Sequence, residues 1–162
     1  MPMHKTKNDI SEKVRVQVAG LLQERLSDAV DLVTHAKQAH WNVKGPAFIA
    51  LHELFDKVYE HAGDYADLLA ERIIQLGGTV EATARVVAKQ SQLPEYPLQI
   101  ASGREHVEAL SRSLAYFGSV VRQGIDRSDE MGDKGTADIF TEISRAVDKD
   151  LWFVEAHLQA ER

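Results

Sequence analysis

The chain has 162 residues, a net charge of −6 and no cysteine. These values fit one domain with a single hydrophobic core, and they exclude disulfides and thiolate metal sites. No apolar run approaches the roughly 20 residues of a membrane span, and the polar first nine residues lack the apolar stretch of a signal peptide. We therefore expect a cytoplasmic protein without a membrane partner, whose acidic surface favours cations over nucleic acid.

Four long helices and one short helix are predicted, and strand patterns are few. Short connections join the first two long helices and the last two, whereas a long crossover containing the short helix joins the pairs. This order is typical of a ferritin-like four-helix bundle in the all-α class. The predicted helices cover about residues 9–39, 46–76, 82–89, 102–128 and 135–159.

The second long helix carries two different faces. Its apolar residues recur at helical spacing and mark a core face. A second stripe holds His52, Asp56, Asp67 and Glu71, which fall at roughly 0, 40, 60 and 100° around the helix axis. Small and apolar residues share this stripe, among them Gly63, which costs about 1 kcal/mol relative to alanine inside a helix. The stripe is therefore interpreted as a face that meets another protein surface.

Distance along this helix limits what the stripe can bind. Asp56 and Asp67 are separated by about 16 Å of helix axis, whereas bonds from a transition metal to nitrogen or oxygen are roughly 2 Å long. The midpoint of His52 and Glu71 lies between residues 61 and 62. A two-fold axis at that point would place His52 and Asp56 of one chain opposite Asp67 and Glu71 of a second copy. Two symmetric sites shared between subunits would result.

Imidazole and carboxylate ligands without a thiolate suit iron, manganese or zinc. His40 precedes the second helix and completes a predicted set of His40, His52 and Asp56 with Asp67 and Glu71 of the mate. The alternative is that these acids are solvated helix residues and the histidines are structural. The remaining histidines are interpreted as structural or solvent-facing; those considered are His35, His61, His106 and His157.

Two rival motifs are incomplete. His52 to Asp56 resembles the H-E-x-x-H motif of zinc proteases, but Asp56 replaces the second histidine. The Glu-x-x-His pairs of di-iron bundles are absent from the sequence. A metal site built within one subunit, as in ordinary ferritins, is therefore disfavoured.

The chain resembles the Dps family, the miniferritins named as DNA-binding proteins from starved cells. The resemblance covers nearly the whole chain after the first helix begins, and all five ligand positions agree in spacing. The motifs that carry it are Lys37-Gln38-Ala39-His40-Trp41-Asn42-Val43-Lys44-Gly45, His52-x-x-x-Asp56, Asp67-x-x-x-Glu71-Arg72, Gln75-Leu76-Gly77-Gly78, Tyr96-Pro97-Leu98, Thr136-Ala137-Asp138-Ile139 and Asp148-Lys149-Asp150-Leu151-Trp152-Phe153.

The resemblance implies a hollow shell of twelve subunits with ferroxidase centres at its two-fold interfaces. Family members oxidise Fe(II) with hydrogen peroxide or oxygen, store the ferric mineral and so protect DNA; zinc or manganese could substitute for iron. Trp41 and Trp152 are expected near the centre, with core packing as the alternative. Acid-lined three-fold pores are implied at Asp129 and Asp138, with Asp133 as a further candidate, and solvated acids at a helix start are the alternative.

DNA binding in the family often depends on a lysine-rich tail. Here residues 1–8 are predicted to form a flexible tail before a single domain at 9–162, and the tail lysines are Lys5 and Lys7. Two lysines per chain on an acidic body predict few phosphate contacts. The alternative functions are a nucleoid-associated, DNA-compacting shell whose iron chemistry is secondary, and a scaffold bundle that binds no metal.

Overall fold

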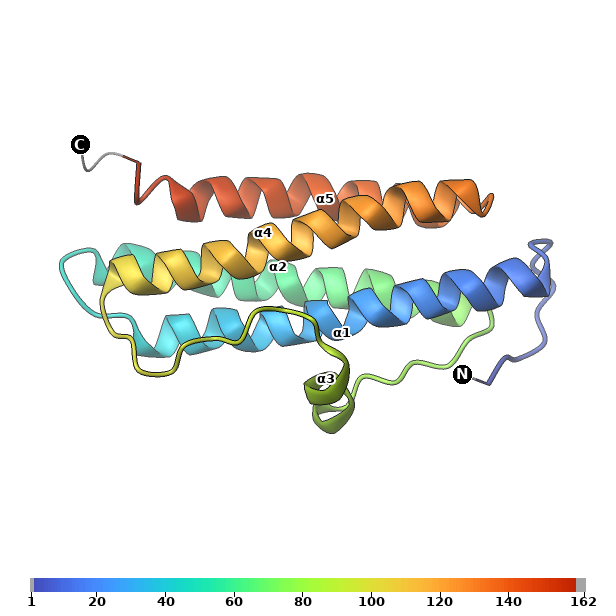
Figure 1. Cartoon of the computed structure of the whole chain (residues 1–162), viewed down its shortest axis with the longest axis horizontal. Coiled ribbons are helices and arrows are strands. Elements are labelled where there is room, and N and C mark those ends of the chain that lie inside the picture. The colour runs from blue at the N-terminus through green and yellow to red at the C-terminus, as the bar shows by residue number, and fades with distance from the viewer. Residues whose placement is uncertain (1, 160–162) are drawn as a thin grey trace.

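A computed structural model describes residues 2–159 and contains five helices arranged as two antiparallel hairpins (Figure 1). The first hairpin pairs α1 with α2 and the second pairs α4 with α5, while the short α3 lies outside the bundle against α1. The helices are α1 (Glu12–Asn42), α2 (Phe48–Gln75), α3 (Ala84–Gln90), α4 (Gly103–Glu130) and α5 (Lys134–Glu155). The predicted four-helix bundle with a short crossover helix is confirmed. Among the described residues, no helix is both long and apolar enough to cross a bilayer.

Several predicted helix ends differ from the observed ones by a few residues, and the two largest differences at C-terminal ends have a visible cause. The first helix continues through Trp41 and Asn42, where the Asn42 amide donates to the Gln38 carbonyl at 2.9 Å. The last helix ends at Glu155, four residues early, and Nδ1 of His157 donates to the Phe153 carbonyl at 3.0 Å. Both side chains satisfy carbonyls that a helix terminus leaves without partners. Residues 160–162 of the predicted domain lie outside the described residues.

The two hairpins pack through aromatic and aliphatic side chains that are fully buried. Phe55 of α2, Phe117 of α4 and Phe140 of α5 are the largest of them. Gly124 of α4 faces the Phe140 ring, and a Cβ atom at this position would lie 3.0 Å from three ring carbons. The glycine therefore lets α4 and α5 approach closely enough to enclose the ring.

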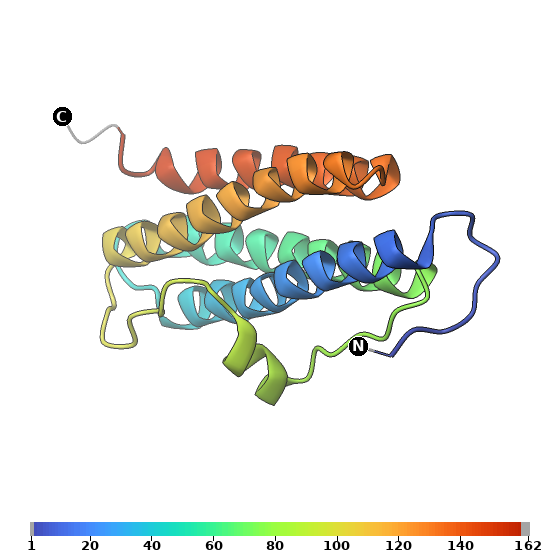
Figure 2. The same ribbon diagram turned by 45° about the vertical axis from the view of Figure 1, so that its right-hand side comes forward.

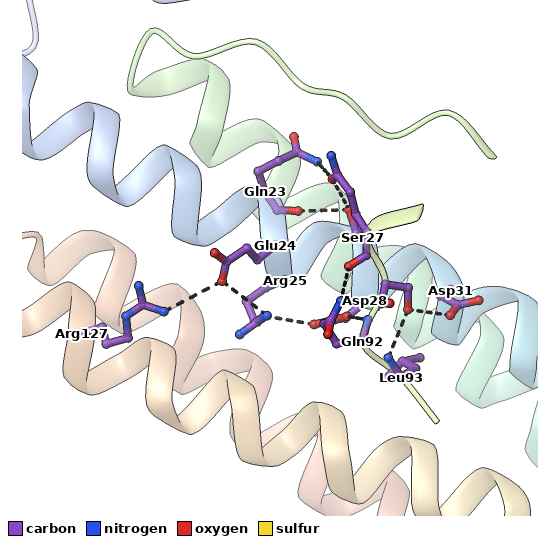
Figure 3. Close-up of polar contacts among 11 residues, drawn as sticks. Gln23, Glu24, Arg25, Ser27, Asp28, Asp31, Gln92, Leu93 and Arg127 are labelled. Carbon is purple, nitrogen blue, oxygen red and sulfur yellow. Dashed lines mark hydrogen bonds and ion pairs between the residues drawn. The ribbon is translucent and has the colours of Figure 1, made fainter. Parts of the chain in front are cut away.

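Polar side chains of α1 hold the crossover in place, as Figure 3 shows. The Gln23 amide donates to the Glu81 carbonyl at 2.7 Å and accepts from the Glu81 N–H at 3.0 Å. Asp28, fully buried, accepts from the Gln92 N–H at 2.8 Å and lies 3.0 Å from Arg25. Because most of the crossover has no secondary structure, its backbone groups need such partners. Burial raises the pKa of Asp28 above its ordinary value, against the opposing influence of these partners.

Two buried histidines tie the later part of the crossover to the bundle. Nδ1 of His35 on α1 lies 2.9 Å from the Ser113 hydroxyl on α4, and the Tyr96 hydroxyl lies 2.8 Å from Nδ1 of His106. The His35 and Tyr96 rings pack 5.1 Å apart. The sequence-based interpretation of these two histidines as structural agrees with this arrangement. Burial lowers the pKa of both histidines because it disfavours the charged imidazolium.

The lowered pKa values predict acid sensitivity. The unfolded chain binds protons at these histidines below about pH 6.5, whereas the folded chain resists protonation. The free energy of unfolding should therefore fall as the pH drops through 6.5 and should level off below the folded-state pKa. Urea unfolding between about pH 7.5 and 5.5 measures this fall. His106→Asn should reduce the pH dependence, whereas His157→Asn, at an exposed position, should not; equal pH dependence in parent and His106→Asn would contradict this origin.

Candidate metal centre

The α1–α2 hairpin brings three of the predicted ligands together. His40 lies near the end of α1, and His52 and Asp56 lie on the first turns of α2. The two imidazole rings stack with their centroids 3.7 Å apart, and Nδ1 of His40 lies 3.9 Å from the Asp56 carboxylate. Residues separated by the turn between the helices therefore form one compact group, which we call the histidine half-site: His40, His52 and Asp56.

Reciprocal hydrogen bonds fix both imidazoles. Nδ1 of His40 lies 2.8 Å from the His52 carbonyl, and Nδ1 of His52 lies 2.9 Å from the His40 carbonyl. A carbonyl oxygen can only accept, so each Nδ1 carries the proton. Each Nε2 of the neutral rings then keeps its lone pair for a metal ion. Such outer partners are what orient histidine ligands in metal sites.

A lysine that the sequence reasoning missed completes the histidine half-site. The Lys37 ammonium donates to the Asp56 carboxylate and also lies 4.3 Å from the centroid of the Tyr59 ring. This hydrogen bond, together with the positive charge of Lys37, lowers the pKa of Asp56. The carboxylate is thus held ionised, with a cation already beside it.

Asp67 and Glu71, the acidic half-site, lie apart from the histidine half-site on the same helix. Both are exposed, and within residues 2–159 neither has a hydrogen bond or ion pair. Asp67 is about 16 Å of helix axis from Asp56. No three histidine or acidic side chains of the described chain converge to hold a metal ion. One chain therefore presents two separated halves of a site.

Within residues 2–159, the stretch of α2 between the half-sites is open at Gly63, and exposed isoleucines flank it. A Cβ atom at Gly63 would meet nothing within 4 Å. Ile49 and Ile74, near the two ends of α2, are 60% and 58% exposed. Figure 2 shows the same bundle from a second angle, with α2 beside α1.

Comparisons with known proteins agree with this arrangement. A family model described as "Ferritin-like domain" matches residues 19–162. The DNA protection during starvation protein of Agrobacterium fabrum is 45% identical over 98% of each chain, and that of Mycolicibacterium smegmatis is 35% identical over 93% of this chain and 82% of its own. The structure of Dps from Microbacterium arborescens in the high iron form matches with a TM-score of 0.86 and 36% identity, over 96% of this chain and 99% of that one.

The chain belongs to the Dps family of ferritin-like proteins.

The two tryptophans expected near the centre of this Dps-family chain are both at its surface. Trp41 follows His40 and is 69% exposed, in a groove of about 620 Å³ that Lys37 and Tyr59 also line. Trp152 of α5 is 60% exposed and packs against Phe153 with ring centroids 4.9 Å apart. The structure thus brings Trp41 next to the histidine half-site within the chain, and it joins Trp152 by no described contact to the ligands.

The three candidate pore acids fall around the turn between α4 and α5, with different surroundings. Asp129 and Asp138 are exposed, and Asp129 pairs with the Lys134 ammonium at 2.8 Å. Asp133 is buried, where its carboxylate accepts from the Thr136 N–H at 3.0 Å and pairs with Arg72 at 2.7 Å. These contacts give Asp133 a capping role at the start of α5, and its place in a pore stays a prediction. The pairing of Arg72 with Asp133 was not predicted from the sequence.

The residues before α1 run beside the end of α2. The His4 N–H donates to the Gly77 carbonyl at 2.6 Å, and the Thr79 hydroxyl donates to the Pro2 carbonyl at 3.2 Å. Lys5 and Lys7, the candidate DNA contacts, are exposed on this segment. Both lysine side chains therefore project from a backbone that is hydrogen-bonded to the bundle.

Lys37 predicts a measurable effect on metal affinity. A divalent ion at the histidine half-site must share Asp56 with the lysine ammonium, and the two cations repel each other. Lys37→Met should therefore tighten Co(II) binding by about two- to fivefold, the range expected for a partly exposed ion pair. Calorimetric titration measures this, with Lys57→Met as the control because its ammonium pairs with Glu60 instead. Weaker binding in Lys37→Met would show that the lysine supports the site.

Proposed function

We propose that this Dps-family chain is a ferroxidase subunit that oxidises Fe(II) at sites shared between two copies and stores the ferric product inside a shell of twelve. Iron is the substrate and cargo. The observation that carries the proposal is the pair of complementary half-sites on one uncovered face of α2. The high iron form of the Microbacterium arborescens relative supports an iron cargo for this chain as well.

A single two-fold axis accounts for the whole α2 face. The pairs His52 with Glu71 and Asp56 with Asp67 have the same midpoint, between residues 61 and 62. The two exposed isoleucines, Ile49 and Ile74, share that midpoint and the same side of the helix. An antiparallel α2–α2 pair would bury these isoleucines against each other and join each histidine half-site to an acidic half-site. The apolar and metal-binding parts of the face thus support the same partner, a second copy.

The joined site suits two ferrous ions. Two neutral imidazoles and three carboxylates supply nitrogen and oxygen ligands that iron accepts, and zinc or manganese could occupy the same positions. Each ferrous ion gives one electron, and hydrogen peroxide takes two electrons and two protons to become two water molecules. Two ferrous ions bound side by side would therefore reduce peroxide fully to water, without releasing hydroxyl radical. Oxygen is the alternative oxidant.

The shell would take up iron through pores formed where subunits meet. Asp129 and Asp138 remain the proposed pore acids because both are exposed, whereas Asp133 is buried under Arg72. Lys134 reduces the negative charge at Asp129. Uptake of cations through such a pore would depend more on Asp138 than on Asp129.

DNA compaction is the second candidate function, because Lys5 and Lys7 are exposed and could contact phosphates; the curated relatives are named for DNA protection during starvation. We propose that DNA compaction is a minor activity of this chain. We also propose that the protein is cytoplasmic, with association with the nucleoid as the alternative. Only Lys5 and Lys7 are available on the segment before α1, and the hydrogen bonds of His4 and Pro2 limit how far that segment can reach. Protection of DNA would then come mainly from removing ferrous iron and peroxide.

Mixing two inactive variants tests the shared site. One variant carries His40→Ala and His52→Ala, and the other carries Asp67→Ala and Glu71→Ala. Each alone should assemble into shells of twelve by light scattering but oxidise Fe(II) poorly. Random co-assembly in equal amounts should restore about a quarter of the sites, because each mixed two-fold pair holds one intact combination. Stopped-flow oxidation with peroxide measures the recovery.

The matched control mixes single variants His40→Ala and His52→Ala. Both substitutions fall in the same half-site, so no combination of chains restores a full ligand set. Recovery in the first mixture alone supports the shared site. If both mixtures stay inactive although mass spectrometry confirms co-assembly, the sites are not shared and the proposal is wrong.

DNA binding should be weak near neutral pH at about 0.15 M ionic strength, because each chain offers two tail lysines and the body is acidic. Gel retardation with the full shell measures it, and Lys5→Ala with Lys7→Ala should remove whatever retardation remains. Lys13→Ala with Lys89→Ala, at exposed positions elsewhere, serves as the control. Tight, salt-resistant retardation would reveal a different binding surface.

A further inference from the structure

A buried carboxylate joins α5 to the side of α2 that faces away from the ferroxidase ligands. Asp150 is only 3% exposed, between the core residues Val147 and Val154 of α5. One carboxylate oxygen lies 2.8 Å from Nδ1 of His61, and the other accepts from the Tyr65 hydroxyl at 2.7 Å. Both partners lie one turn apart on α2, so every oxygen of the buried acid has a donor from that helix.

The hydrogen-bond directions leave one nitrogen of His61 available. An ionised carboxylate only accepts, so Nδ1 of His61 carries the proton and Nε2 of the neutral ring keeps its lone pair. Burial and the neighbouring Asp150 raise the pKa of Tyr65, which keeps its hydroxyl a donor. The His61 side chain is 44% exposed, so the ring reaches solvent while its other edge is anchored. A carboxylate behind a histidine is the arrangement that holds and activates metal-binding imidazoles.

The His61 ring opens into a hollow of about 280 Å³ between α2 and α5. Two further carboxylates line this hollow, Asp64 from the same turn of α2 and Glu142 from α5. Both are exposed, and neither has a hydrogen bond or ion pair within the described chain. Lys149 is the single lysine of the lining, and its ammonium lies 5.5 Å from the centroid of the Phe153 ring. The hollow therefore combines a fixed neutral imidazole with an excess of negative charge.

We propose that Nε2 of His61 anchors a second binding position for a divalent transition-metal ion, separate from the ferroxidase ligands. In the rotamers described for residues 2–159, no three ligand side chains converge on a point. Binding therefore draws in Asp64 or Glu142, whose exposed side chains can rotate, and water completes the coordination. Imidazole with carboxylate selects Fe(II), Co(II) or Zn(II) over Ca(II) and Mg(II). Because His61 is about 180° around α2 from His52, this ion does not share ligands with the ferroxidase centre.

The alternative role of the Asp150 group is a purely structural tie between α2 and α5. The two roles differ in what His61 itself contributes. A structural tie depends on Tyr65 and Asp150 in the core and gains little from the exposed ring edge. A metal position depends on the Nε2 lone pair, which His61→Ala removes while leaving the buried Tyr65–Asp150 hydrogen bond in place.

The test uses full-length protein in which His40→Ala, His52→Ala, Asp67→Ala and Glu71→Ala remove four of the five proposed ferroxidase ligands, so that its result is independent of the proposed ferroxidase function. Titration with Co(II), followed by the visible absorption of the bound ion and by calorimetry, should show one class of sites per subunit. His61→Ala in this background should abolish that class. Asp150→Asn should weaken it about 10- to 100-fold, the range for loss of an outer partner of a histidine ligand.

Two controls keep the result specific. His157→Ala removes another exposed histidine, whose Nδ1 is held by a backbone carbonyl and not by a carboxylate, and it should leave the Co(II) sites unchanged. Thermal unfolding of each variant confirms that the bundle is intact. If His61→Ala binds as much Co(II) as its parent, or if His157→Ala loses as much as His61→Ala, the proposal is wrong and the Asp150 group is a structural tie.

Discussion

Metal–ligand bonds of about 2 Å and a rise of about 1.5 Å per helical residue govern the candidate centre of this protein. On a helix of 28 residues such as α2, side chains eleven residues apart cannot bind the same ion. The chain nevertheless places two groups of predicted ligands on one side of α2, and the described residues leave this side open at Gly63. Under the proposed two-fold pairing, a second copy completes each site, so assembly would also create the metal centre. The exposed isoleucines Ile49 and Ile74 would then give the association an apolar driving force that does not depend on metal.

The α1–α2 hairpin orients the histidine half-site through contacts within the protein. His40 and His52 come from different helices, yet each ring is held by the other residue's carbonyl. The orientation of the ligands therefore depends on the packing of the hairpin, which buries Leu51 and Phe55 directly beside them. Gln23 and Asp28 of α1 also bind the crossover, and these hydrogen bonds help to hold α1 in place. The orientation of the two imidazoles thus depends on the packing of the helices that carry them.

Local patterns in the sequence predicted the bundle, and they placed the stripe residues on one helix, as α2 has them. The role of these residues as metal ligands stays a prediction. Helical periodicity, the capping residue Ser102 and the glycines after α2 all act within a few residues, so the helix order was predictable. The contacts that sequence reasoning missed or misplaced all join distant segments. Lys37 reaches Asp56 across the hairpin, and Arg72 reaches Asp133 across two hairpins. Asp150 could have been found, because an acid between Val147 and Val154 sits on the core face of α5 and requires a buried partner.

Crystals grown with Fe(II) under anaerobic conditions test the shared centre most directly. Anomalous scattering measured on both sides of the iron absorption edge locates the ions independently of the protein density. We expect iron between the histidine half-site of one subunit (His40, His52 and Asp56) and the acidic half-site of the adjacent one (Asp67 and Glu71). Two such positions should be related by the two-fold axis near Ala62. Iron bound by ligands of a single subunit, or the two half-sites lying apart in the assembly, would contradict it.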